Sequence, residues 1–419
     1  MGIATPIQLF NTSWSAHRLS PLHHSKDHRV LIGNQDALKT YAKRLRDVLT
    51  GDFLRSMQVT LTKNLADDAF SKAGSLVDCR WEFISTNDHV DANEEDEDDE
   101  PSIEMRDCMG IFITLDYENI AYRAALLTSP DGYSPASTDK RWKQSTCLPL
   151  LLTRMPTTLR NTFIEFLTTN FDAYCSTLHL PPEYLCMVLE ATITYLARSE
   201  SSWQASSAIL EQVLKDTQLT LSFGQSIAPA LKSLDVSLPR ETLSTFARGP
   251  RNANTSYFST SLSQYMDQHL AMKVNLGNAT AEELGNGSRS AQHLWLSKVA
   301  TGTFVLTSEG RFKLIDTSNS QDYAEEQTEV QRLIRSANGQ ILRSLVRRAV
   351  GDDVTTPRNF RVTTSKGSTG LENSRGCSLA GASRDPHNLT QPGEPQTQLL
   401  FAATGNRNVW QAYKTRNAI

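Results

Sequence analysis

Four histidines lie close together near the start of the chain, in the stretch HRLSPLHHSKDH. They are His17, His23, His24 and His28. Zinc sites usually place two histidines one turn apart on a helix or combine them with cysteines, and a turn at Pro21 offers neither arrangement. Solvated histidines in a loop are therefore the simpler interpretation, and we expect no metal site.

A serine suggests a second kind of chemistry. In the stretch FGQSIAPAL, Ser226 follows an expected strand, as the nucleophile of a G-x-S-x-G elbow would. The second glycine is absent, and Pro229 would obstruct the helix that has to follow. The sequence also lacks a Walker loop, a G-x-G-x-x-G motif and an H-E-x-x-H motif. A hydrolase that uses Ser226 is a distant alternative, and we expect no enzyme, no catalytic residue and no cofactor.

Composition limits the class of protein. With 419 residues, of which 39% are hydrophobic, the chain can bury a sizeable core, which excludes a wholly disordered protein. Its six cysteines include no C-x-x-C pair, so we expect free thiols in a reducing compartment. The first residues do not resemble a secretory signal, and no apolar run is long enough to cross a bilayer. We expect a soluble intracellular protein without membrane contact.

The first half of the chain, residues 1–128, combines helix and strand patterns. Apolar residues at three- and four-residue spacing predict an amphipathic helix over 35–49, with Gly51 as its stop. Alternation of apolar and polar residues predicts a strand over 75–84, and two apolar runs on either side of Asn119–Ile120 predict a hairpin. We expect a helix laid on an antiparallel sheet.

Two segments of this region do not resemble folded elements. The stretch DANEEDEDDE (91–100) contributes eight carboxylates, which repel one another and cannot bury apolar surface. We therefore expect a disordered acidic loop over 86–104. Residues 129–145 have the composition of turns and are expected to link the two halves of the chain.

The second half, residues 146–350, repeats the combination of helices and antiparallel strands. Helices are predicted in TTLRNTFIEFLTTNFD, PEYLCMVLEATITYLARS, FSTSLSQYMDQHL and the segment 325–350, and strands in QLTLSF, SLDVS and the segment 294–316. From 351 to 419 no periodicity is found, and we expect a disordered tail. The fold class is therefore α+β, with antiparallel sheets flanked by helices in two halves.

Basic residues of the second half could contact DNA phosphates independently of sequence. The candidates are Lys298, Arg311, Lys313, Arg343 and Arg347. Because no aromatic stacking motif accompanies these charges, an ordinary solvated face is the preferred interpretation. DNA binding remains the alternative function.

Several stretches, taken in order, resemble fungal members of the centromere protein L (CENP-L) family. They are LFNTSWSAHRLSPLH, LKTYAKRLRDVLTGDFLRSMQV, LPLLLTRMPTTLRNTFIEFLTTNFD, KDTQLTLSF, APALKSLDVSLPRE, LSQYMDQHLAMKV and LSKVATGTFVLTSEGRFKLI. The resemblance covers residues 8–350. It implies a nuclear, non-catalytic subunit of the inner kinetochore at the centromere, with HRLSPLHH as an amino-terminal segment that packs through Leu19, Pro21 and Leu22.

The resemblance also implies partners. In this family the carboxy-terminal sheet contacts CENP-N, and the pair works with other inner-kinetochore subunits on centromeric chromatin. The predicted hairpin 303–315 would end a sheet, and an open strand edge invites pairing with another strand. The same edge could let the isolated protein form a homodimer. The side chains that face either the core or the partner are Phe304, Leu306, Phe312 and Leu314.

Overall fold

We describe the protein from a computed structural model. The residues that it describes are 6–24, 31–60, 73–85, 107–129, 145–198, 213, 217–223, 232–239, 242, 246, 257–270, 294–316, 325–351, 399–404 and 409–414. Ser226, His28 and the acidic segment 86–104 lie outside these residues, as do most of the predicted linker and residues 352–398 of the predicted tail.

The helices agree closely with the apolar periodicity of the sequence. Within the described residues they are η1 (Pro6–Leu9), α1 (Gln35–Thr60), α3 (Thr157–Phe171), α4 (Pro182–Arg198), α7 (Tyr257–Leu270) and α8 (Glu325–Val350). The predicted stop at Gly51 was wrong, because α1 continues to Thr60. A single glycine costs a helix only about 1 kcal/mol, which neighbouring turns can offset. No described helix is both long and apolar enough to span a bilayer.

The strands form one large sheet and one small pair. They are β1 (Ser13–Leu19), β2 (Leu22–His23), β3 (Leu76–Ser85), β4 (Cys108–Tyr117), β5 (Ala121–Leu127), β6 (Ser145–Thr146), β7 (Leu150–Arg154), β8 (Cys175–Thr177), β9 (Gln218–Phe223), β10 (Ser233–Ser237), β11 (Leu294–Ala300), β12 (Phe304–Thr307), β13 (Arg311–Leu314), β14 (Leu399–Thr404) and β15 (Val409–Lys414). The hairpin predicted around Asn119–Ile120 is β4 and β5.

The order of strands in the large sheet is β14-β15-β10-β9-β11-β12-β13-β1-β7-β5-β4-β3, with β8 paired to β1 outside this path. Neighbouring strands are antiparallel, apart from a parallel contact between β10 and β15. The α+β class with a large antiparallel sheet and flanking helices is confirmed. Strands β14 and β15 lie within the predicted tail, where the sequence pattern did not indicate them.

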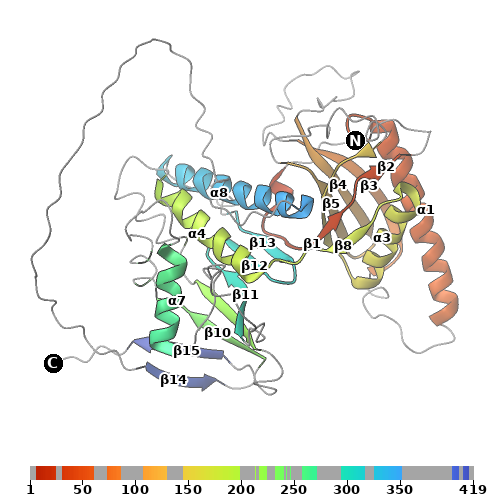
Figure 1. Cartoon of the computed structure of the whole chain (residues 1–419). Coiled ribbons are helices and arrows are strands. Elements are labelled where there is room, and N and C mark those ends of the chain that lie inside the picture. Colours follow the sequence, from red (N-terminus) through yellow and green to blue (C-terminus); the bar gives the residue numbers. More distant parts are fainter. Residues whose placement is uncertain are drawn as a thin grey trace, which may run out of the picture.

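Strand β1 joins the two parts of the large sheet (Figure 1). On one side Ser13 and Ser15 lie opposite Lys313 and Arg311 of β13, and on the other side Ser15 lies opposite Thr153 of β7. Strand β7 follows the predicted linker, and it also pairs with β5 of the first half. The sheet is therefore continuous from β3 to β9 through the first strand of the chain.

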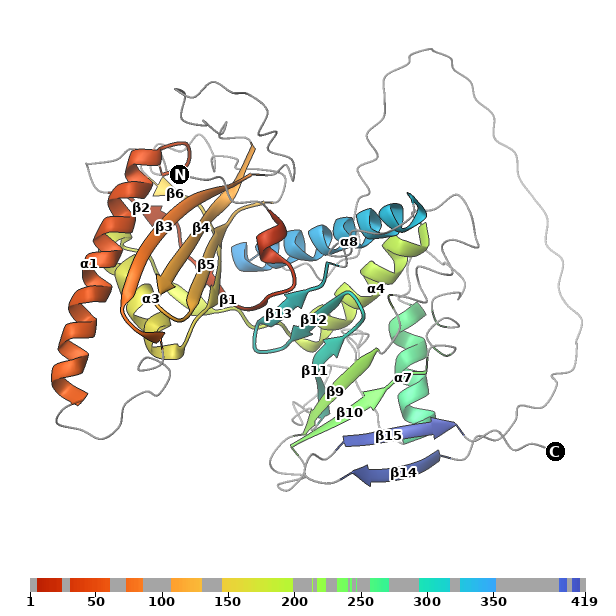
Figure 2. The same ribbon diagram turned by 180° about the vertical axis from the view of Figure 1, so that it is seen from behind.

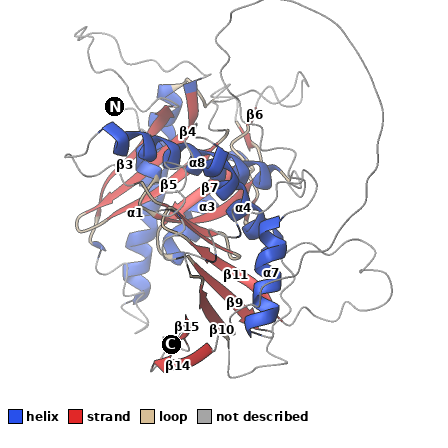
Figure 3. Cartoon of the chain, turned by 90° about the vertical axis from the view of Figure 1, so that its left-hand side faces the viewer, coloured by secondary structure: helices blue, strands red, loops and turns tan. Residues whose placement is uncertain are grey.

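Helices cover the sheet on different faces in its two parts. Helices α1 and α3 pack on one face of the part formed by β3, β4, β5 and β7, and they enclose one hydrophobic core. Helices α4, α7 and α8 lie beside β9–β13 (Figure 2). They pack with a second core, which includes buried side chains of β9, β11, β12 and β13. Helix α7 runs beside β9 and β10 (Figure 3).

The apolar stripe of α3 shows how sequence determines this packing. Pro156 precedes the helix, and Asp172 ends it in the left-handed conformation. The five predicted stripe residues are all buried: Leu159, Phe163, Phe166, Leu167 and Phe171. Their three- and four-residue spacing places them on one face of a helix with 3.6 residues per turn. The same spacing in α8 buries Ile341, Leu345 and Val346 against the second core.

Candidate partner-binding surface

The four apolar residues of the hairpin belong to the core of this chain. Phe304 and Leu306 of β12 are fully buried, and Phe312 and Leu314 of β13 are almost fully buried. All four pack in the core that α4 and α8 cover. We had expected the hairpin to end the sheet with an open edge. This expectation was wrong, because β13 pairs with β1. The sequence could not reveal this pairing, since the two strands are far apart in the chain.

Alternate residues of the same strands point to the opposite side of the sheet, which we call the outer face. One cross-strand row places Thr220 of β9 opposite Lys298 of β11, and Lys298 opposite Thr307 of β12. The backbone N–H of Arg311 donates a hydrogen bond to the Thr307 hydroxyl at 3.1 Å, which continues the row onto β13. In the next row Lys313 lies opposite Val305. The outer face is thus mostly polar.

Three of the predicted DNA contacts meet on the outer face. Lys298, Arg311 and Lys313 occupy outward positions of β11 and β13. The Arg311 side chain is 72% exposed, and its Nε atom lies 3.9 Å from a carboxylate oxygen of Glu309. Such an exposed ion pair contributes little to stability, so the Arg311 guanidinium is available to a phosphate or a partner carboxylate.

The other two predicted DNA contacts lie elsewhere. Arg343 and Arg347 belong to α8, whose apolar residues face the second core and therefore the inward side of β12 and β13. Arg347 is exposed and Arg343 is half-buried. The five basic residues consequently form two groups on opposite sides of the sheet, and they cannot contact one stretch of DNA together.

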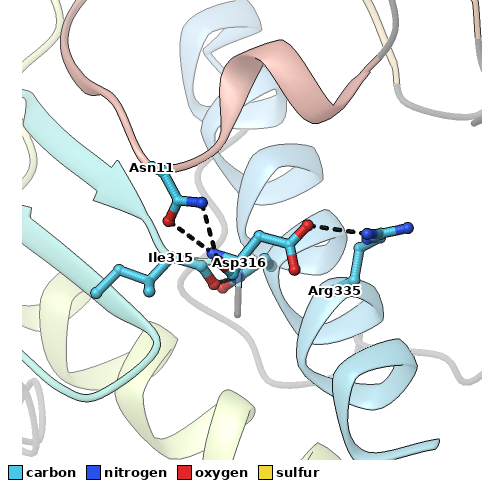
Figure 4. A network of polar contacts seen from close by, with 5 residues as sticks. Asn11, Ile315, Asp316 and Arg335 are labelled. Atoms are coloured by element: carbon cyan, nitrogen blue, oxygen red, sulfur yellow. Dashed lines mark hydrogen bonds and ion pairs between the residues drawn. The ribbon is translucent and has the colours of Figure 1, made fainter. Parts of the chain in front are cut away.

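A polar network, which the sequence did not reveal, fixes α8 to the end of the hairpin (Figure 4). The Asn11 side chain donates to the Asp316 carbonyl at 2.9 Å and accepts from the Asp316 N–H at 3.0 Å. The Asp316 carboxylate, 4% exposed, is 2.9 Å from the Arg335 guanidinium. Asn338 of α8 donates to the Ile315 carbonyl at 3.0 Å. The network joins the amino-terminal segment, β13 and α8.

His17 and His24 do not lie in one site. His17 is only 5% exposed, and its Nε2 atom lies 3.2 Å from the Thr153 hydroxyl. Burial, helped by the nearby Arg160 charge, lowers the pKa of His17 to about 4. The prediction of a solvated loop was wrong for this residue, because β1 is a central strand covered on both faces. His24 instead contacts the Thr146 hydroxyl at 2.7 Å.

No group of three or more potential metal ligands is found among the described residues. The packing role expected for Leu19 and Leu22 is confirmed, since both are buried. The free cysteines Cys79, Cys108 and Cys186 are also buried, and burial raises the pKa of the Cys108 thiol to about 11.

Comparison with known proteins identifies the class of this molecule. A family model of centromere proteins matches residues 8–350, which span both parts of the large sheet. A search of curated proteins found no match. The matched family consists of structural proteins of the kinetochore. The chain belongs to the Centromere protein L (CENP-L) family. It is therefore a nuclear centromere protein that serves the kinetochore in chromosome segregation.

Proposed function

We propose that the protein is a scaffold subunit of the inner kinetochore, without enzymatic activity, which forms a heterodimer with a CENP-N-like protein. The family match over residues 8–350 is the observation that carries this proposal. The pair would then contact other inner-kinetochore subunits and centromeric chromatin. In the absence of the partner, the isolated chain would form a homodimer through the same region.

The outer face of β9–β13 is the proposed contact surface. Its side chains are exposed or half-buried, whereas the inward side chains of the same strands are occupied by α4, α7 and α8. Phe304, Leu306, Phe312 and Leu314 then act as the packing base that holds the outward side chains in register. Val305 supplies a half-buried apolar centre between the basic residues, as interfaces commonly require.

Size-exclusion chromatography with light scattering tests the proposal. We expect the full chain and the CENP-N-like protein to elute as a one-to-one complex at micromolar concentration. Val305→Lys should abolish the complex, because it replaces the apolar centre of the interface with a positive charge directly opposite Lys313. Arg343→Glu on α8 is the matched control and should leave the complex intact. If the wild-type proteins elute separately, the heterodimer proposal is wrong. If both variants behave alike, the contact lies elsewhere.

DNA binding is the alternative function, and the common placement of Lys298, Arg311 and Lys313 favours it. Reversing these three charges should weaken duplex binding and reduce the magnitude of the salt slope by about 0.9 for each lost phosphate contact. Reversing Arg343 and Arg347 provides the control on the other side of the sheet. An unchanged slope in the triple variant would exclude the outer face as a DNA-binding surface.

A further inference from the structure

Strand β3 is the last strand at one end of the large sheet, and β9–β13, which carry the outer face, lie towards the other end. Its ten residues, Leu76–Ser85, pair with β4 on one side only within the part of the chain that the structure describes. The other side of such a strand presents backbone N–H and C=O groups at alternate residues. Ten residues form a long edge, since edge strands that resist further pairing are usually short.

Within the described part of the chain, some charged side chains along this edge have ion-pair partners and others do not. Arg80 makes ion pairs with Asp78 at 3.5 Å and with Asp116 at 2.5 Å. The half-buried carboxylate of Glu82 makes no ion pair or hydrogen bond with a described residue. Burial raises its pKa, and the charge of Arg80 on the same strand opposes this shift. Val77, near the start of the strand, is 54% exposed although it is apolar. The edge therefore offers one carboxylate and one apolar contact to an added strand.

The charge around β3 determines which occupant it favours. Four carboxylates on β3, β4 and the turn after β4, those of Asp78, Glu82, Asp116 and Glu118, outnumber the cations Arg80 of β3 and Arg46 of α1, whose charge acts on Cys79. The sequence that follows β3 adds eight carboxylates between residues 91 and 100. A second copy of the chain would bring the same negative charge to the contact, and like charges repel. A basic segment would instead be attracted.

We propose that the free edge of β3 binds an extended, lysine- or arginine-rich segment of another protein, which adds to the sheet as a further strand. The backbone of the segment makes the ladder of hydrogen bonds, as in other cases of strand addition. One basic side chain pairs with Glu82, and one apolar side chain covers Val77. This contact is separate from the outer face, so it does not compete with the heterodimer.

A fluorescently labelled peptide of alternating lysine and valine serves as the probe for the full chain. We expect saturable binding by anisotropy, with slower hydrogen exchange at amides within residues 80–84, beyond Cys79, whose N–H already donates to the Asp78 carboxylate at 2.8 Å. Glu82→Gln should weaken binding about tenfold, because a charge-assisted hydrogen bond is lost. Glu309→Gln is the matched control: Glu309 lies in the β12–β13 turn with its side chain 75% exposed, and its substitution should change nothing.

Two further measurements distinguish strand addition from general attraction to acidic residues. A peptide of the same composition with one central proline cannot complete the ladder and should not protect β3. Deleting residues 91–100 should slow association but keep the protection. Equal binding of the proline peptide, or equal affinity of Glu82→Gln, would overturn the proposal. So would a homodimer of the full chain in which the β3 amides are already protected.

Discussion

Asp316 connects three parts of the chain through its backbone and its carboxylate. Asp316→Asn keeps the size of the side chain but removes the charge that pairs with Arg335. Because the carboxylate is buried, we expect the free energy of unfolding to fall by about 1–3 kcal/mol. Urea unfolding followed by circular dichroism provides the measurement.

The control for Asp316 is the exposed pair between Arg311 and Glu309. Glu309→Gln breaks an ion pair whose two side chains are 72% and 75% exposed, so it should cost less than about 0.5 kcal/mol. Similar losses for Asp316→Asn and Glu309→Gln would show that the network does not fix α8 to the hairpin.

His17 should make stability depend on pH. Its pKa is lowered from 6.5 to about 4 in the folded chain, so the unfolded chain binds more protons between these values. The contribution of the neutral histidine is complete above pH 6.5 and is lost as the pH falls towards 4, by about 3 kcal/mol at most. His17→Gln should flatten the pH profile of the urea midpoint in this range.

The histidines also show what sequence could not predict about single residues. All four lie in one stretch rich in polar residues. The solvent exposure of His17 depends on elements far away in the chain. His17 is buried because β7 and β8 flank it within the sheet and because helices cover both faces of the sheet. Leu19 and Leu22, by contrast, were predicted correctly, since their burial follows from their own apolar character.

Two glycines offer a test at the level of whole elements. Gly310, in the turn predicted between β12 and β13, has φ +78°, and an added Cβ would lie 2.1 Å from the Leu178 carbonyl oxygen. Gly310→Ala should therefore destabilise the protein by about 2 kcal/mol or more. Gly339 lies within α8 with nothing within 4 Å of an added Cβ. Gly339→Ala should stabilise the protein by about 0.5–1 kcal/mol.

Thermal unfolding measures both glycine variants, which should shift the midpoint in opposite directions. A stabilising effect of Gly310→Ala would mean that the turn does not approach Leu178 closely. A loss of stability in Gly339→Ala would mean that α8 bends at this residue in solution and needs the freedom of glycine there.

Helices were more predictable than strand order for a physical reason. The bounds of α8 follow from a stripe of apolar residues within one segment of 26 residues. Strand β3 and the β4–β5 hairpin also follow from local alternation and a tight turn. The helix end predicted at Gly51 was wrong because the helical pattern on both sides outweighed the single glycine.

At the scale of the whole molecule, β1 should make the two parts of the sheet unfold together. The Ala16 N–H donates to the Gly310 carbonyl at 2.9 Å, and the Ala16 carbonyl accepts from the Leu178 N–H at 3.0 Å. Ala16→Pro removes the donor in a central strand and should cost about 3 kcal/mol. Hydrogen exchange should then speed up in both β4 and β9. Acceleration in β9 alone would contradict the coupling.

The order of strands around β1 could not be predicted from sequence. Pairing between strands distant in the chain depends on which edges remain open after local hairpins form, and no periodic signal records it. The outer face was missed for the same reason: Lys298 and Arg311 share a row only because β12 lies between their strands. The sequence therefore supplied the candidate basic residues but not their division between two sides of the sheet.

Strand β1 also imposes an order of events during synthesis. Ser13 of β1 cannot pair with Lys313 of β13 until the ribosome has added Lys313, 300 residues later (313 − 13 = 300). At roughly 5–20 residues per second, that delay lasts about 15–60 s. Strands β7 and β8 emerge much earlier and can pair with β1 first. During the remaining interval the nascent chain carries an incomplete sheet, so chaperones that shield open edges should determine how much of this protein reaches the centromere.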